Sequence, residues 1–283
     1  MEVQAFAKLN LTLDILGKRP DGYHDLRMVM QSITLADTLT LEENQGEGLR
    51  VSATLRFPPT GEKNLAAAAA LRFWEALGRG PEDLDIHIQK RIPVCAGMAG
   101  GSSDAAAVLR ALNLRAGTPF SPLGLARLGE QVGSDVPYCV LGGTALAEGR
   151  GEQLTPLPPL PRCWVVACKP DFPISTPELF AQADRVKLRR RPDTAGLLSA
   201  LEAGDLGGVA RRMYNVFEDV LPHRLYARVA EIKNELVQRG ALGANMSGSG
   251  PTAFGLFDCQ EAAEEARTSL AERYRDTFLC ETV

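Results

Sequence analysis

The chain has 283 residues, of which 45% are hydrophobic and 23% charged, values that exclude global disorder, a collagen-like repeat and a coiled coil. A chain of this length favours two domains. The formal net charge of −4 gives no electrostatic reason to expect binding to nucleic acid or to an anionic membrane. Because 27 glycines stand against 3 histidines, glycine-rich loops are better candidates for a site than histidine clusters.

The N-terminal half begins with residues 3–16, in which apolar and polar residues alternate as in a half-buried strand. Lys8, Asn10 and Thr12 share the polar face of that strand. Asn64 is expected to cap a helix, and Ser121-Pro122 to begin another. The other expectations for this half are strands at 28–42, 50–57, 83–89, 136–141 and 144–147, and helices at 64–78, 104–116 and from 121 to 133.

The C-terminal half is expected to begin after a linker rich in leucine and proline, Thr155–Pro161. This places one domain at residues 1–155 and a second at 156–283. Strands and helices interleave in both halves, which is typical of the α+β class. The expected elements are strands at 163–168, 253–257 and 277–282, a helix starting at Thr176-Pro177, an interrupted helix at 195–219, and helices at 222–239 and 260–274.

The cellular location is expected to be cytoplasmic. The longest purely apolar run, Leu65–Leu71, is far shorter than the roughly 20 residues of a membrane span, and the N-terminus lacks the apolar core of a signal peptide. The six cysteines form no CxxC pair, so we expect reduced and mostly buried thiols. The three histidines are far apart in sequence, and no metal site is assigned.

The strongest candidate for a binding site is the glycine-rich stretch that begins at Pro93. Glycines 97, 100 and 101 allow a close approach of the backbone to a ligand. Ser102 and Ser103 are expected to cap the helix that follows, whose free amides and positive dipole end favour an anion such as phosphate. The spacing is neither that of a Walker A loop nor that of a dinucleotide fingerprint. The alternative is a tight turn that needs glycine for its shape alone.

Two further segments accompany this loop. Met246–Thr252 is a second glycine-serine loop directly before an apolar strand, although such turns are common. Gly133–Pro137 places Asp135 in a turn before an expected strand, because proline favours an extended conformation at Val136. The alternative for Asp135 is a side chain that only stabilises its own turn.

Together these segments resemble the GHMP kinase superfamily. Pro93–Ser103 is similar to its phosphate loop and Ser247–Thr252 to its C-terminal motif, although Cys95, Met98 and Ala99 stand where the family more often has Gly, Leu and Gly. Within the superfamily, the chain resembles the kinases of 4-diphosphocytidyl-2-C-methyl-D-erythritol. That likeness rests on Ala7–Thr12, Arg19–Leu26 and Gly133–Pro137, and the motifs follow in the expected order across residues 5–257.

The resemblance implies a fold and a reaction. The fold would have an N-terminal domain like ribosomal protein S5 domain 2 and a ferredoxin-like C-terminal domain. ATP, accompanied by Mg²⁺, would donate its γ-phosphoryl group to the C2 hydroxyl of the substrate, giving the 2-phosphate and ADP in the non-mevalonate route to isopentenyl diphosphate. The expected partners are these two small molecules, with no nucleic acid and no membrane, and the expected state is a monomer or weak dimer.

The resemblance also assigns roles to residues. Asp135 would be the general base and Lys8 a catalytic cation beside it. Tyr23 would stack on the cytosine and His24 would hydrogen-bond its edge. The ATP-binding residues would be Pro93, Val94, Cys95, Ala96, Gly97, Met98, Ala99, Gly100, Gly101, Ser102 and Ser103. The substrate-binding residues would be Asn10, Tyr23, His24, Thr176, Phe180, Gly248 and Ser249.

Several alternatives stay open at this point. The chain could be another GHMP kinase, for homoserine or a sugar, or a nucleotide-binding regulator without catalysis. Lys8 could be a solvated strand lysine, Phe180 a core residue of its helix, and Thr176 only a helix cap. The basic run Arg185–Arg191 is interpreted as a solvated loop rather than a phosphate clamp.

Overall fold

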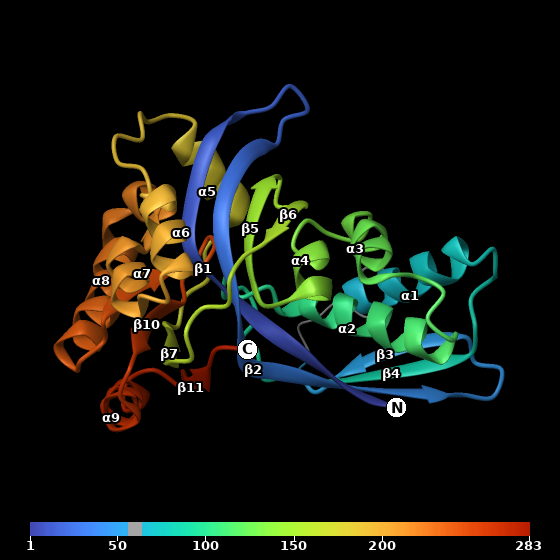
Figure 1. Cartoon of the computed structure of the whole chain (residues 1–283). Helices are drawn as coiled ribbons and strands as arrows, with labels where there is room; N and C mark the ends of the chain where they lie inside the picture. Colours follow the sequence, from blue (N-terminus) through green and yellow to red (C-terminus); the bar gives the residue numbers. More distant parts are fainter. Residues whose placement is uncertain (56–63) are drawn as a thin grey trace. The chain divides into compact units, whose positions relative to one another are not determined.

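The computed structural model describes residues 1–55 and 64–283, which form two compact units that are discontinuous in sequence (Figure 1). The first unit contains Met1–Ala7, Leu35–Val94 and Ala99–Gly142, and the second contains Lys8–Thr34, Cys95–Met98 and Gly143–Val283. Strands β1 (Glu2–Lys18) and β2 (His24–Glu43) therefore contribute residues to both units. The predicted boundary at 155–161 divides the chain once, whereas each compact unit combines several segments of the chain. That boundary therefore stays a prediction.

The first unit is a sheet covered by helices. Its strands lie in the order β3-β4-β2-β1, with β3 parallel to β4 and β4 antiparallel to β2. Helices α1 and α2 pack on each other above β3 and β4, and α3 packs on α4 (Figure 1). The elements beyond β1 and β2 are β3 (Leu49–Ala53), α1 (Leu65–Ala76), β4 (Leu84–Gln89), α2 (Gly100–Arg115), α3 (Pro122–Glu130) and α4 (Val136–Leu141).

One hydrophobic core joins that sheet to its helices. Alternate residues of β4, namely Leu84, Ile86 and Ile88, point into the core, while the residues between them are exposed or half-buried. Small side chains of α1 and α2 meet them, which allows the helices to approach the sheet closely. As predicted, Asn64 caps α1 by accepting from the Ala66 amide at 2.9 Å, and Ser121 caps α3.

The second unit contains the remaining parts of β1 and β2 and all later elements. Strand β5 pairs antiparallel with β2 and with β6, and β8 pairs parallel with β1 at Thr12 and Leu13. The elements after α4 are β5 (Thr144–Gly149), β6 (Gln153–Pro156), β7 (Trp164–Lys169), α5 (Thr176–Ala183), α6 (Thr194–Glu202), α7 (Leu206–Arg212), β8 (Tyr214–Asn215), a 3₁₀ helix (Val216–Val220), α8 (His223–Gln238), β9 (Gly243–Met246), β10 (Ala253–Phe257), α9 (Gln260–Ala271) and β11 (Asp276–Glu281).

The C-terminal part of this unit has the predicted ferredoxin-like arrangement. Its four-stranded sheet has the order β11-β7-β10-β9, and neighbouring strands are antiparallel. In chain order, the elements read strand β7, helix α8, strands β9 and β10, helix α9 and strand β11, which is the split βαβ pattern. Helices α8 and α9 pack against the sheet (Figure 1).

Two predictions near the candidate site are wrong. Residues 136–141 form helix α4 instead of a strand, because Pro137 lies in the first helical turn, where the missing amide costs no hydrogen bond. Helix α2 begins at Gly100 rather than at Asp104. Its N-cap is Ala99, in a left-handed conformation with φ +58°, so Ser102 and Ser103 lie inside the first turn and do not cap the helix.

Other differences are smaller. Strand β6 occupies the start of the expected linker, strand β9 was not predicted, and the expected helix 195–219 is divided into α6, α7, β8 and the 3₁₀ helix. The N-cap of α5 is Ser175, not Thr176. The expected strand 50–57 ends at Ala53, and residues 56–57 lie outside the described residues.

The cysteines are thiols, but only half of them are buried. Cys163, Cys168 and Cys280 are buried, whereas Cys95 and Cys259 are exposed. Burial raises the pKa of Cys163 and Cys168 to about 12, which keeps these two thiols protonated and unreactive. None of the helices in the described part of the chain has the length and apolar character needed to cross a bilayer.

Candidate functional site

The glycine-rich loop is divided between the units. Pro93, Val94 and Ala99–Ser103 belong to the first, and Cys95–Met98 to the second. Cys95, Gly97 and Ala99 have φ values of +53°, +72° and +58°. Such a sequence of left-handed residues turns the chain sharply between β4 and α2, and it strains the two residues that are not glycine.

In the first unit, the loop ends at the N-terminal turn of α2, where Gly101 is exposed and Gly100 and Ser102 are half-buried. The Ser103 amide donates to the Ala99 carbonyl at 2.8 Å, so it is the first amide with an acceptor inside the helix. The amides of Gly100, Gly101 and Ser102 precede it and have no such acceptor. A Cβ at Gly100 would lie 3.1 Å from the Ile92 side chain, so only glycine fits without a shift. These amides form a candidate anion site.

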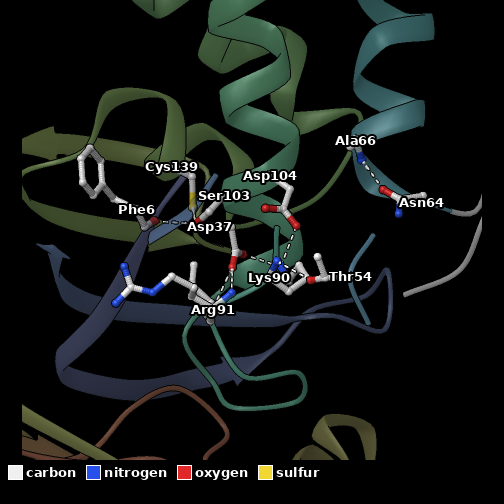
Figure 2. A network of polar contacts seen from close by, with 11 residues as sticks. Phe6, Asp37, Thr54, Asn64, Ala66, Lys90, Arg91, Ser103, Asp104 and Cys139 are labelled. Carbon is white, nitrogen blue, oxygen red and sulfur yellow. Dashed lines mark hydrogen bonds and ion pairs between the residues drawn. The ribbon is translucent and has the colours of Figure 1, made fainter. Parts of the chain in front are cut away.

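The two serines of the loop differ in their surroundings. Ser103 is 1% exposed, and its hydroxyl donates to the Phe6 carbonyl at 2.7 Å (Figure 2). Its hydrogen is therefore already used to hold the start of β1. Ser102 is half-buried, and its hydroxyl has no hydrogen bond within the described residues. Ser102 is thus the better candidate of the two for a side-chain contact with phosphate.

Asp135 occupies the N-cap position of α4 and is half-buried. Its carbonyl accepts from the Cys139 amide at 3.0 Å, but its carboxylate makes no capping hydrogen bond. A Cβ at Gly133 would lie 4.0 Å from the Ser102 hydroxyl oxygen, which brings the loop before Asp135 next to the start of α2. The first unit therefore holds the predicted base and the candidate anion site on neighbouring loops.

A buried charged cluster, formed by Asp37, Lys90 and Asp104, lies behind the start of α2 (Figure 2). The Lys90 ammonium donates to Asp37 at 2.5 Å and to Asp104 at 2.7 Å. Asp37 also accepts from the amides of Arg91 and Ile92, at 2.5 and 2.8 Å. The cluster thus ties the end of β4 to the first turns of α2, on both sides of the glycine-rich loop.

Sequence reasoning missed this cluster. Asp37 lies in β2, Lys90 directly follows β4, and Asp104 lies in α2, so nothing in their spacing connects them. One local signal was present, an aspartate directly after the glycine-serine loop in an otherwise alanine-rich helix. A charged residue on an apolar helix face needs a partner when it is buried.

In the second unit, Lys8 is buried, with 4% of its surface exposed, so the alternative of a solvated strand lysine is wrong. Its ammonium donates to the Asn10 side-chain oxygen at 2.6 Å and to the Gly97 carbonyl at 3.0 Å. Its amide donates to the Met98 carbonyl at 3.2 Å. Lys8, Asn10 and the middle of the glycine-rich loop therefore come together in this unit.

The second glycine-serine loop lies against the first. The Ser247 hydroxyl donates to the Gly97 carbonyl at 2.9 Å and accepts from the Asn10 amide at 3.3 Å. A Cβ at Gly97 would be 2.1 Å from the Ser247 carbonyl oxygen, and a Cβ at Gly248 would be 2.9 Å from the Gly97 carbonyl oxygen. Both glycines are therefore required for close contact of the two backbones. The Asn215 amide group supports the arrangement by donating to Met246 and Gly248 carbonyls at 2.8 Å.

Thr176 and Ser249 also meet in this unit, where their hydroxyl oxygens are 2.6 Å apart. This contact gives Thr176 a position beside the second glycine-serine loop, since it is not the cap of its helix. Asn215 and Ser247 were not among the predicted site residues. The Ser-Gly-Ser-Gly motif could have indicated Ser247, whereas no local pattern indicates Asn215.

The predicted base-recognition residues are only partly brought together. His24 is 8% exposed and stacks on Phe180, with ring centroids 4.4 Å apart and planes 16° from parallel. Its Nε2 atom lies 2.7 Å from Asp184. Tyr23 is instead 55% exposed, and its ring faces the Arg150 guanidinium at 5.3 Å. Phe180 therefore presents a face to His24 rather than to Tyr23.

Asp184 was not predicted as part of this group. Hydrogen bonds from Lys18 and from His24 lower the pKa of its carboxyl, so it accepts from both side chains as a carboxylate. Asp184 follows Phe180 by one helical turn, which is the spacing that places two side chains on one face. It fixes the orientation of the His24 ring.

The basic run Arg185–Arg191 is only partly a solvated loop. Arg185, Lys187 and Arg189 are exposed. Arg191, however, donates to the Asp14 carboxylate at 2.6 Å and to the Ile15 carbonyl at 2.5 Å. The end of the run therefore anchors the segment after α5 to strand β1.

Comparison with known proteins identifies the family of the chain. The GHMP kinases N terminal domain matches residues 64–143, and the GHMP kinases C terminal domain matches residues 197–276. The chain is 43% identical over 284 residues to a 4-diphosphocytidyl-2-C-methyl-D-erythritol kinase of Alkaliphilus metalliredigens, covering 100% of this chain and 96% of that protein. The chain belongs to this kinase family within the GHMP kinases.

Two further relatives support the assignment. A kinase of the same name from Lachnoclostridium phytofermentans is 44% identical over 267 residues, which cover 94% of this chain and 91% of that one. A crystal structure of a 4-(cytidine 5'-diphospho)-2C-methyl-D-erythritol kinase superposes with a TM-score of 0.82 at 32% identity, covering 100% of this chain and 99% of the other. The chain is an ATP-dependent small-molecule kinase with the predicted two-domain GHMP kinase fold.

Gly97→Ala is expected to lower kcat/KM by about 100-fold or more, because the new methyl group would displace the loop from Ser247. Gly117→Ala is the matched control. It has a similar φ of +79°, but a Cβ there meets no atom within 4 Å. Steady-state kinetics of both variants test this, and equal losses would show that backbone strain, not the contact between loops, is responsible.

Lys90→Met is expected to lower the free energy of unfolding by about 3–5 kcal/mol, because it leaves two buried carboxylates without their cation. Urea unfolding measures this change. Lys187→Met, the same substitution at an exposed lysine, should stay within about 0.5 kcal/mol of the wild type. A small effect at Lys90 would contradict the structural role of the cluster.

Proposed function

We propose that the chain transfers the γ-phosphoryl group of ATP to the C2 hydroxyl of 4-diphosphocytidyl-2-C-methyl-D-erythritol, giving the 2-phosphate and ADP. The observation that carries the proposal is identity above 40% over essentially the full chain to relatives named for that substrate. The reaction would be a step of the non-mevalonate route to isopentenyl diphosphate. A cytoplasmic location and a monomeric or weakly dimeric state stay predictions.

The start of α2 supports the nucleotide part of the proposal. The amides of Gly100, Gly101 and Ser102 would donate to the phosphate oxygens, and the helix dipole would favour their negative charge. Residues Pro93–Met98 would shape the rest of the loop around the nucleotide. Mg²⁺ would enter with ATP as part of the substrate. Within the described residues, no group of three or more His, Cys, Asp or Glu side chains could hold a metal ion by itself.

Asp135 is proposed as the general base. An aspartate is too weak a base to ionise an alcohol in advance. In the loose transition state of phosphoryl transfer, however, the nucleophile needs little activation and its proton leaves late. The carboxylate would orient the C2 hydroxyl and accept its proton as the new P–O bond forms. Its half-buried position, on the loop next to the start of α2, supports this role.

Lys8 is proposed as the catalytic cation. A buried ammonium group has a strong electrostatic effect on charge that develops nearby, because little water screens it. Its hydrogen bonds to Asn10 and to the Gly97 carbonyl would hold it in one position during the reaction. Asn10 would position Lys8 as well as contact substrate hydroxyls.

The cytidine end of the substrate would bind around His24 and Phe180. His24 would donate to or accept from the base edge, with its ring held by Asp184. Tyr23 would supply a stacking face, and Phe180, stacked on His24, would line the pocket beside it. Gly248, Ser249 and Thr176 would line the part of the pocket formed by the second glycine-serine loop, where the Thr176–Ser249 contact supports their placement.

Asp135→Asn is expected to reduce the rate of product formation by roughly 10²–10⁴-fold without loss of folding, because the amide cannot accept the proton. ³¹P NMR of wild type and variant with ATP and the cytidyl substrate measures the 2-phosphate directly. Asp258→Asn, at an exposed position, is the matched control and should keep full activity. Turnover of homoserine or mevalonate but not of the cytidyl substrate would overturn the proposal.

His24→Ala is expected to raise KM for the cytidyl substrate by about 10–100-fold with kcat nearly unchanged, because it removes binding remote from the reacting hydroxyl. Steady-state kinetics at saturating ATP measures the two parameters separately. His223→Ala, at an exposed histidine, should leave both unchanged. A large loss of kcat at constant KM would contradict the role of His24 in base recognition.

A further inference from the structure

The buried charged cluster, Asp37, Lys90 and Asp104, has two carboxylates and one ammonium group. The side chains of these residues are at most 6% exposed, so solvent can neutralise the excess negative charge only by supplying a proton. The cluster is also adjacent to the candidate anion site at the start of α2. A Cβ at Gly100 would be 3.3 Å from the Lys90 nitrogen.

The hydrogen bonds identify the carboxylate that would take such a proton. Asp37 accepts at both oxygens, from Lys90 at one and from the Arg91 and Ile92 amides at the other. Asp104 accepts from Lys90 at Oδ2 alone, and within the described residues its buried Oδ1 atom has no hydrogen-bond partner. Protonation at Oδ1 of Asp104 therefore breaks no hydrogen bond of the cluster.

The electrostatic balance of the cluster agrees with this geometry. Burial raises the pKa of Asp104 to about 7, since the attraction of Lys90 is weaker than the combined effect of desolvation and Asp37. Burial acts to lower the pKa of the Lys90 ammonium, but the two carboxylates outweigh it and raise that pKa. Near neutral pH, the lysine is charged while Asp104 exchanges its proton with solvent.

Among the residues that the structure describes, the other charged groups of the neighbouring helices do not face Asp104. Helix α1 packs on α2 through alanines, and its Arg72–Glu75 ion pair is exposed. On α3, Arg127 and Glu130 are exposed, and α4 carries no carboxylate, ammonium or guanidinium group. On α2 itself, Arg110 donates to the Cys139 carbonyl beyond the next turn. The charge that Asp104 experiences is therefore set by Lys90, by Asp37 and by the start of its own helix.

An anion bound at that helix start would change this balance. Asp104 lies about 6 Å along the axis from Gly100, since each residue adds about 1.5 Å. The positive end of the helix dipole stabilises an ionised carboxylate in this region. A phosphate group bound at the helix start would interact with the same positive end, and its negative charge would offset this stabilisation of the Asp104 carboxylate. Two negative charges at this distance in a buried environment repel each other, which favours the protonated carboxyl.

Resting on the proposed function, which brings ATP to the start of α2, we propose that nucleotide binding is coupled to uptake of one proton at Asp104. The proton comes from solvent, and it neutralises the excess negative charge behind the phosphate groups. Asp104 is thus a positioning residue whose charge state changes with nucleotide occupancy, while Lys90 stays charged and paired with Asp37.

Isothermal titration calorimetry tests the proposal. MgATP is titrated into the full chain at pH 7.5 in buffers of different ionisation enthalpy, and the dependence of the heat on the buffer gives the number of protons taken up. The wild type should take up a measurable fraction of a proton more per ATP than Asp104→Asn, because a pKa that rises further from about 7 increases the protonated fraction of Asp104 at pH 7.5. Any change in the protonation of ATP itself on binding occurs with both proteins and cancels in the difference.

Asp258→Asn is the control, and it should match the wild type in proton uptake. Equal proton uptake by the wild type and Asp104→Asn, with ATP bound to both, would overturn this inference and leave the kinase proposal intact. No binding of ATP to the wild type would overturn both. A structural role of Asp104 alone would change affinity or melting temperature, but not the number of protons.

A second measurement needs no variant and covers the case in which Asp104→Asn fails to fold. Infrared difference spectra of the wild type at pH 7.5, with and without the non-hydrolysable analogue of ATP, should gain the carbonyl stretch of a protonated carboxylic acid. No gain in that band on saturation with the analogue would contradict the proposal.

Discussion

The carbonyl oxygen of Gly97 is the acceptor on which both glycine loops depend. It accepts from the Lys8 ammonium at 3.0 Å and from the Ser247 hydroxyl at 2.9 Å. A glycine loop has no side chains with which to hold its own shape, so its backbone must be held by donors from elsewhere in the chain. The first of these hydrogen bonds also holds the Lys8 ammonium in place, so the position of the glycine-rich loop and that of the proposed catalytic cation are set together.

The proposed phosphate site does not depend on a basic surface. Its net charge is −4, and the candidate phosphate site consists of helix amides with a buried lysine behind them. Amides and a paired ammonium group attract phosphate at short range, where the geometry is exact, and they do not attract other polyanions at long range. This arrangement leaves a buried cluster with one more carboxylate than ammonium groups, and in our proposal a proton taken up at Asp104 offsets the excess negative charge.

The motifs predicted the parts of the site that are local in sequence. The alternation of residues 3–16 placed Lys8 and Asn10 on one face, and the two glycine-serine loops were found from the order of their residues and from the elements that follow them. What escaped prediction depends on contacts between distant segments: Asp37 with Lys90 and Asp104, Asn215 with the second loop, and Asp184 with His24. Helix α4 escaped for a different reason. A proline that favours an extended predecessor in isolation is equally compatible with a first helical turn, and packing of Val136 against Gly129 decides between them.

The close contact between Gly97 and the second glycine-serine loop has a consequence for anyone who wishes to redesign this enzyme. Neither loop is an independent module, because the space for each backbone exists only while the other lacks a side chain. Transplanting a nucleotide loop from another kinase would therefore require transplanting its distant counterpart as well. Substitutions in the two loops should be inherited as pairs during evolution, although some 150 residues of sequence separate them.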